Sequence, residues 1–247
     1  MLKNPRLRLG AALWLAGMAG VIVLSLTVIP QLLERAPRSV PLGVAVATTV
    51  AQSGMLLALA VWAGVALSRQ VGLGAPVFEA ALSGNNAWSA LKRQLAPAGI
   101  GGVFVGGLLV LLTRIAPPEL LALGQTIEIP VAAKLLYGGV TEEILMRWGL
   151  MTALIWLPWR LVQRRVGLPR TSYVTGAIVA AALLFGILHL PAAAAMGASL
   201  NPSVVAYIIV GNTVPGVLFG FLYWRYGIEA AIIAHALGHA VAVLAAV

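Results

Sequence analysis

Residues 141–147 read Thr-Glu-Glu-Ile-Leu-Met-Arg and lie inside one long apolar segment, from about residue 129 to 157. Charged side chains in hydrocarbon are costly, by ~2.5–3.5 kcal/mol each on insertion scales. Such residues face the interior of a helical bundle, pair with one another, and mark chemistry or transport. The stretch therefore predicts a membrane-embedded helix whose Glu142, Glu143 and Arg147 point into the protein.

The composition extends this prediction to the whole chain. Of 247 residues, 61% are hydrophobic and 9% are charged, whereas soluble domains carry about 25% charged residues. Apolar runs of roughly 20 residues favour helices over the ten-residue alternating strands of a β-barrel. We therefore expect an all-α, polytopic transmembrane helical bundle. About seven spans are predicted, near residues 11–29, 42–67, 97–115, 129–157, 172–190, 203–224 and 228–247.

Residues 1–247 are predicted to form a single integral membrane domain, with N-terminal helices in 1–128 and a helical core in 129–247 that carries the unusual polar residues. In the longest connection, residues 87–95 suit an amphipathic helix at the headgroup level, and a plain polar linker fits them equally well. The glycines between residues 99 and 107 indicate either close packing against another helix or a flexible stretch.

Basic residues set the expected orientation. They lie in short loops, which accounts for the net charge of +9 without a nucleic-acid partner. The inner side is expected to hold Lys3, Arg6, Arg8, Arg69, Lys92, Arg93, Arg160, Arg164, Arg165, Arg170 and Arg225, and the outer side Arg35, Arg38 and Arg114. This bias predicts a cytoplasmic N-terminus. Abundant Ala and Arg weakly favour a bacterial source, hence an inner-membrane location. Lys134 is expected near the outer end of its span, reaching toward the interface.

Several intramembrane chemistries are excluded by missing residues. The chain has no Cys and no Asp, which excludes thiol nucleophiles and a presenilin-like aspartyl site. No Gly-x-Ser-Gly context supports a rhomboid-like serine site, and no His-Glu-x-x-His motif supports a site-2-type zinc protease.

The two adjacent glutamates are predicted to differ. Glu143 and Arg147 are spaced i, i+4, with the acid first, which favours an ion pair. Glu142 is rotated by about 100° from Glu143 and has no partner on its own helix. A buried acid without a partner can exchange protons near neutrality, as a general base must. A purely structural ion pair explains Glu143 and Arg147 equally well.

The three histidines lie in two later apolar segments. Phe185 and His189 are spaced i, i+4, so the ring can shield the imidazole from lipid. His235 and His239 have the same spacing and project from one helix face, where they can bind a metal or donate hydrogen bonds to an oxyanion. Asn212 is a further polar group in an apolar span, suited to an interhelical hydrogen bond or to the site.

At these residues the chain resembles the CAAX-protease and bacteriocin-processing family (CPBP), also called the ABI family. Its signature places Glu-Glu-x-x-x-Arg, Phe-x-x-x-His and His-x-x-x-Asn, or a similar last residue, on three membrane helices. Here the motifs begin at Glu142, Phe185 and His235, in that order and with those spacings. The resemblance covers residues 129–247.

The resemblance implies an intramembrane endopeptidase without a metal or other cofactor. Glu142 would be the base that activates water, and His189 would share that water. His235 would stabilise the oxyanion, together with His239 or Asn212. His239 stands where prenyl-protein proteases of the family usually have Asn, and it can donate only in the right tautomer. The expected partner is a membrane-embedded or lipidated protein or peptide.

Three alternatives stay open from the sequence. A zinc peptidase could use Glu142, His189, His235 and His239 as ligands, since four nitrogen and oxygen ligands suffice for tetrahedral Zn²⁺. A proton-coupled transporter would also bury Glu and His, although no clear inverted repeat is present. A non-catalytic scaffold or immunity protein could retain the same residues.

Overall fold

The structure is a computed structural model that describes residues 4–35, 40–124 and 126–246. Within these ranges the chain is helical and has no β-strand, which confirms the all-α prediction. In chain order the helices are α1 (Pro5–Thr27), α2 (Ile29–Leu33), α3 (Leu42–Leu67), η1 (Ser68–Val71), α4 (Pro76–Leu82), α5 (Ala87–Arg114), α6 (Pro118–Gly124), α7 (Val131–Ala133), η2 (Lys134–Glu142), η3 (Ile144–Met151), α8 (Thr152–Leu161), α9 (Thr171–Ala195), α10 (Pro202–Tyr226) and α11 (Ile228–Leu244).

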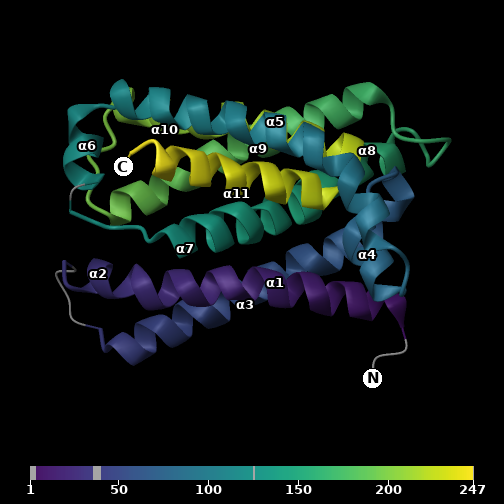
Figure 1. Cartoon of the computed structure of the whole chain (residues 1–247), viewed down its shortest axis with the longest axis horizontal. Helices are drawn as coiled ribbons and strands as arrows, with labels where there is room; N and C mark the ends of the chain where they lie inside the picture. The colour runs from purple at the N-terminus through teal and green to yellow at the C-terminus, as the bar shows by residue number, and fades with distance from the viewer. Residues whose placement is uncertain (1–3, 36–39, 125, 247) are drawn as a thin grey trace.

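The long helices lie side by side along the molecule, and the two termini lie at opposite ends (Figure 1). α11 contacts both α5 and η2, α1 contacts α3 and η2, and α9 packs against α10. In the described part of the chain, five segments are long and apolar enough to cross a membrane, namely Pro5–Leu33, Leu42–Val71, Ala87–Arg114, Thr171–Ala195 and Pro202–Tyr226. The apolar α11 is shorter, at 17 residues. A membrane bundle is thus supported, and the count of seven spans stays a prediction.

The segment that contains the two glutamates differs from the single helix predicted over 129–157. It begins as α7, continues through the π-helices η2 and η3, and ends as α8. The Thr141 hydroxyl donates to the carbonyl oxygen of Gly17 in α1 at 2.6 Å and contacts that of Leu136 at 3.3 Å. A side chain that enters the backbone ladder widens a helix locally, and π-helical turns are frequent at functional sites. Pro158 does not stop the segment, because α8 continues to Leu161.

Other predicted boundaries also shift. Residues 87–95 are helical, but they form the first part of the continuous helix α5 rather than a separate interfacial helix. The predicted loop before them contains α4, whose first backbone N–H groups, at Val77 and Phe78, donate to Glu229 at 2.9 Å each. A carboxylate at a helix N-terminus is stabilising. α9 continues through Pro191 to Ala195, as membrane helices tolerate proline.

Glycines bring α5 close to α11, which carries two of the histidines. A Cβ on Gly102 would lie 2.7 Å from Leu237, and one on Gly106 would lie 2.4 Å from Val241. Both distances are too short for any other residue, so the predicted close packing is confirmed here. Gly107 has no such neighbour.

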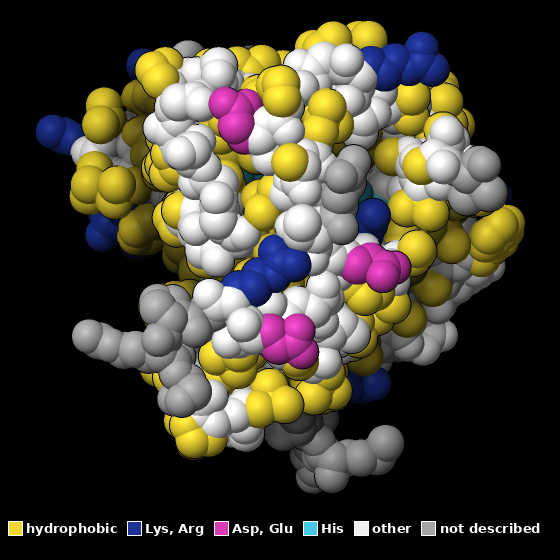
Figure 2. Space-filling view, turned by 90° about the vertical axis from the view of Figure 1, so that its left-hand side faces the viewer, with side chains coloured by type: hydrophobic (Ala, Val, Ile, Leu, Met, Phe, Trp, Pro, Cys, Tyr) yellow, Lys and Arg dark blue, Asp and Glu magenta, His cyan; other side chains and the backbone are white. Residues whose placement is uncertain are grey.

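The connections that carry most basic residues lie at the end of the molecule that holds the N-terminus, between α3 and α5, α8 and α9, and α10 and α11 (Figure 1). The opposite end holds α2, α6 and the C-terminus; Figure 2 shows separate Lys, Arg and Glu side chains there among hydrophobic ones. Lys3 and Arg38, both in the predicted charge bias, lie outside the described residues. The asymmetry is that expected for a cytoplasmic N-terminus, which stays a prediction.

Candidate active site

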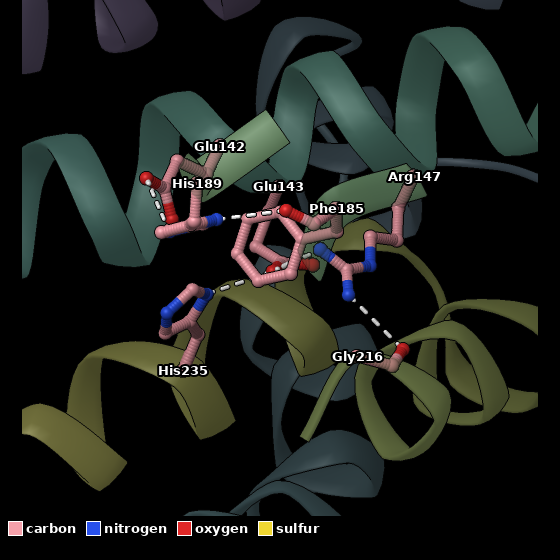
Figure 3. A network of polar contacts seen from close by, with 7 residues as sticks. All are labelled: Glu142, Glu143, Arg147, Phe185, His189, Gly216 and His235. Carbon is pink, nitrogen blue, oxygen red and sulfur yellow. Dashed lines mark hydrogen bonds and ion pairs between the residues drawn. The ribbon is translucent and has the colours of Figure 1, made fainter. Parts of the chain in front are cut away.

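A buried carboxylate, guanidinium and imidazole form the centre of the site (Figure 3). Arg147 donates to Glu143 at 2.9 Å and to the carbonyl oxygen of Gly216 at 3.0 Å. His235 Nδ1 lies 2.8 Å from the same Glu143 oxygen. The Glu143 and Arg147 side chains are 0% and 1% exposed. The predicted ion pair between Glu143 and Arg147 is confirmed. His235 of α11 and the Gly216 carbonyl of α10 add one further contact each. We call Glu143, Arg147 and His235 the buried cluster.

Two phenylalanine rings enclose the guanidinium. Its central carbon lies 4.9 Å from the centre of the Phe185 ring and 5.5 Å from that of the Phe219 ring. Phe219 also stacks on His235, with ring centres 4.4 Å apart and planes at 17°. Cation–π contacts strengthen when the cation is desolvated. The rings therefore stabilise the buried cluster and separate it from lipid.

Sequence reasoning missed two of these contacts. Phe219 lies in an apolar span, where it is indistinguishable from an ordinary core residue, and Gly216 contributes only its backbone oxygen. The sole signal for Gly216 is the Pro215-Gly216 pair within an apolar run, because proline removes a backbone donor and disturbs the helix around it.

The tautomer of His235 follows from its bond to Glu143. A carboxylate that is paired with an arginine accepts hydrogen bonds and does not donate, so His235 Nδ1 carries the bridging proton. In the neutral ring, Nε2 then holds a lone pair. As the neutral imidazole, His235 therefore presents an acceptor at Nε2.

Glu142 and His189 face each other across a gap. Glu142 Oε1 and His189 Nε2 lie 3.9 Å apart, which is too far for a direct hydrogen bond. His189 Nδ1 donates to the backbone oxygen of Phe185 at 2.8 Å, so its Nε2 is also an acceptor in the neutral ring. The Phe185 ring meets His189 edge-on, with centres 4.6 Å apart, as the predicted shielding requires. The side chains of Glu142 and His189 are 18% and 32% exposed.

His239 lies one turn beyond His235, and the two rings stack 5.0 Å apart. Its ring has no hydrogen-bond partner within the described residues, so either nitrogen can carry the proton. Gly138 makes room for it, because a Cβ there would lie 2.8 Å from His239 Nε2. Asn212 donates to the backbone oxygen of Ile208 at 2.8 Å and keeps a second amide hydrogen.

One cavity of about 460 Å³ joins the predicted catalytic side chains. Glu142, His189, His235, His239 and Asn212 all line it. Its volume is within the range of small-molecule sites, about 300–1,000 Å³. The rest of the wall is mainly apolar and includes Leu24, Val28, Leu32, Leu109, Ile129, Leu145, Leu188 and Met196. The structure thus brings polar side chains from four helical segments, η2, α9, α10 and α11, to a single pocket with a polar side and an apolar side. Of the predicted site residues, Glu143 and Arg147 are not part of its wall.

Glu142, His189, His235 and His239 are also the candidate zinc ligands. Within the described parts of the chain, no three His or Glu side chains are grouped as a metal ion would require. The Nδ1 atoms of His189 and His235 are already engaged by a backbone carbonyl and by Glu143. The atoms free to face a metal are Nε2 of His189 and His235, the carboxylate oxygens of Glu142 and the ring nitrogens of His239. Metal independence stays a prediction.

Comparison with protein families identifies the region that supplies the polar side of this pocket. The model of the family described as type II CAAX prenyl endopeptidase, Rce1-like, matches residues 125–241. This range contains all three motifs. Over these residues the chain is similar to the Rce1-like CAAX endopeptidase family. Rce1-like proteins are proteases of membrane-associated prenylated proteins, so the resemblance read from the motifs is confirmed. Comparisons with curated proteins and with solved structures gave no match.

Proposed function

We propose that this chain is an intramembrane endopeptidase that hydrolyses a peptide bond of a lipidated protein, with Glu142 as the general base and no metal. The main support is the 3.9 Å gap between Glu142 and His189, which opens to the cavity. In the carboxylate form, Glu142 presents an acceptor to the gap, neutral His189 presents another at Nε2, and both side chains are partly exposed. A single water molecule fits this arrangement chemically.

The water would donate one hydrogen to Glu142 and the other to His189 Nε2. Its lone pairs would then point away from both acceptors, toward a carbonyl carbon held in the cavity. As the oxygen attacks, the O–H bond to Glu142 breaks and the carboxylate takes the proton. When the tetrahedral intermediate collapses, the C–N bond breaks and Glu142 returns that proton to the leaving amine. General acid–base catalysis of this kind contributes about 10²–10⁴-fold.

The developing oxyanion needs hydrogen-bond donors on the other side of the cavity. His239 can supply one through Nε2–H, and Asn212 can supply its remaining amide hydrogen. His235 can donate from Nε2 only after that atom has taken up a proton, because Nδ1 is bonded to Glu143. We therefore assign the main oxyanion role to His239 and Asn212, and the orienting of α11 to His235.

The apolar side of the cavity suits a lipidated substrate. A lipid attached near the scissile bond could lie along Leu24, Val28 and Leu32, which α1 and α2 contribute. α2 is held in place there, because Gln31 pairs with both backbone groups of Glu128, at 2.8 and 3.0 Å.

The test uses the purified full chain in liposomes with a farnesylated peptide that ends three residues after the modified Cys. Mass spectrometry should detect release of the C-terminal tripeptide. In ¹⁸O-labelled water, one ¹⁸O should enter the new carboxylate of the lipidated product. An intact peptide under all conditions contradicts the proposal. Metal analysis should find no stoichiometric zinc, and a chelator should leave the rate unchanged. Loss of activity that zinc restores supports the zinc peptidase instead.

A further inference from the structure

Lys134 is the one cationic side chain that lines the catalytic cavity within the described residues. It lies at the start of η2, on the same helical run as Glu142. The described residues provide no hydrogen bond or ion pair to its ammonium group; the ion pairs that they contain are Arg69–Glu79 and those of the active site. The structure places Lys134 on the cavity wall, and the expectation that it reaches toward the interface stays a prediction.

Lys134 is half-buried on this wall, and an anion that entered the cavity would find its ammonium group beside mainly apolar side chains, where ion pairs are stronger than in water. Glu142 is the only other charged residue of the wall, and it stands at the far end of η2. The ammonium is thus available to a negative group on a ligand. A CAAX-type substrate carries one, because its cleaved segment ends in the free C-terminal carboxylate.

The distance along the helix between Lys134 and Glu142 agrees with the length of the peptide segment that is cleaved off. Lys134 precedes Glu142 by eight residues, which would correspond to about 12 Å along an α-helix at 1.5 Å per residue and to somewhat less in the wider π-helix η2. Three residues of extended peptide span about 10 Å. A peptide with its scissile carbonyl beside Glu142 would therefore place its third following residue near Lys134. The lysine side chain can cover the small difference.

We infer that Lys134 binds the terminal carboxylate of the substrate and thereby sets the cleavage position three residues from the C-terminus. This inference rests on the proposed peptidase function and adds a determinant of specificity to it. Lys134 is a positioning residue, since it acts on the end of the peptide and not on the reacting atoms. It also sets the direction of the substrate, with the leaving tripeptide lying along η2.

The experiment compares two farnesylated peptides that differ only at the end, one with a free carboxylate and one with a C-terminal amide. The readout is the ratio of their kcat/KM values. For the wild-type chain we expect a ratio of about 10 to 100, the range that a hydrogen bond to a charged group supplies. In Lys134→Met the ratio should fall to near one, mainly through KM of the acid. Lys134→Arg should retain most of the preference. Lys92→Met, at the other end of the molecule, is the matched control and should leave the ratio unchanged.

The outcomes separate this inference from the proposed function. If the wild-type chain cleaves both peptides equally, or if Lys134→Met keeps the preference, Lys134 does not bind the carboxylate, although the peptidase proposal stands. If neither peptide is cleaved, the peptidase proposal fails. Binding of the same two peptides, followed by fluorescence anisotropy, then decides the role of Lys134: a preference for the acid that Lys134→Met abolishes supports it, and equal binding of the two peptides overturns it.

Discussion

Glu142 and Glu143 are neighbours in the chain and differ in every contact that decides reactivity. Glu143 is fully buried and holds two partners, Arg147 and His235, on one oxygen. Glu142 is partly exposed, lines the cavity and faces His189 across a gap. The buried cluster pairs its charges through one Glu143 oxygen and leaves Glu143 Oε2 buried without a hydrogen-bond partner among the described residues, whereas Glu142 and His189 face the cavity. Adjacent residues of one helix can therefore divide a site into a part that holds structure and a part that is free to react.

The strongest test of the difference between the two glutamates is to replace Glu142. Glu142→Gln keeps the size of the side chain and removes the ability to take a proton from water. We expect the cleavage rate to fall by about 10²–10⁴-fold, with the thermal unfolding temperature in detergent close to that of the wild type. Peptide cleavage and thermal unfolding on the same sample measure both. Full activity in this variant would remove Glu142 from the mechanism.

The buried cluster should respond in the opposite way. Arg147→Met leaves the Glu143 carboxylate buried without its cation, which should destabilise the fold by about 3–5 kcal/mol. The double variant Glu143→Gln/Arg147→Met removes both charges, so it should recover part of that loss. Denaturation in detergent titrations measures each step. Equal stability of the wild type and Arg147→Met would mean that the pair contributes nothing to folding.

A third prediction separates the roles of the two α11 histidines, with His239 as an oxyanion donor and His235 as a positioning residue. Removing one oxyanion donor costs about 10²–10³-fold in kcat, so His239→Phe should lower kcat by this amount. His239→Asn retains a donor and should recover much of the rate. Single-turnover kinetics separates this loss from substrate binding. A variant whose KM rises while kcat stays constant would assign His239 to binding rather than to the oxyanion.

The smallest expected effect concerns Phe219, which stacks on His235 and borders Arg147. Phe219→Leu keeps an apolar side chain and removes the aromatic contacts, which are worth about 0.5–1.5 kcal/mol. We expect a modest loss of stability and a small decrease in cleavage rate, measured by unfolding and kcat. Phe221→Leu, in an exposed position on the same helix, is the control. An unchanged stability would show that the stacking is incidental.

Much of this site could be predicted because its chemistry depends on charged and polar residues, which are rare in membrane helices. Glu142, Glu143, Arg147 and the three histidines are the polar residues whose positions in apolar runs need an explanation. Their i, i+4 spacing predicted the Glu143–Arg147 pair and the contact between Phe185 and His189, both of which the structure contains.

Other features depend on contacts between distant segments and left no readable pattern. The bond from Arg147 to the Gly216 carbonyl and the stacking of Phe219 on His235 join residues from separate helices. The π-helical form of η2 and η3 was also missed, because the apolar pattern over 129–157 is that of an ordinary helix. The hydroxyl of Thr141, bonded to α1, is the local departure from that pattern.

The amino-acid sequence by itself determined that the chain is a helical membrane protein and which side chains had to be buried together. Hydrophobicity and local spacing act over one or two helical turns, so they can be read without knowing the neighbours. The tertiary structure decided that His235 joins the Glu143–Arg147 pair, which nitrogen of His235 carries the proton, and that Lys134 lies on the cavity wall. These depend on which helix lies opposite, because a hydrogen bond or a desolvated charge is defined by atoms only a few ångströms away.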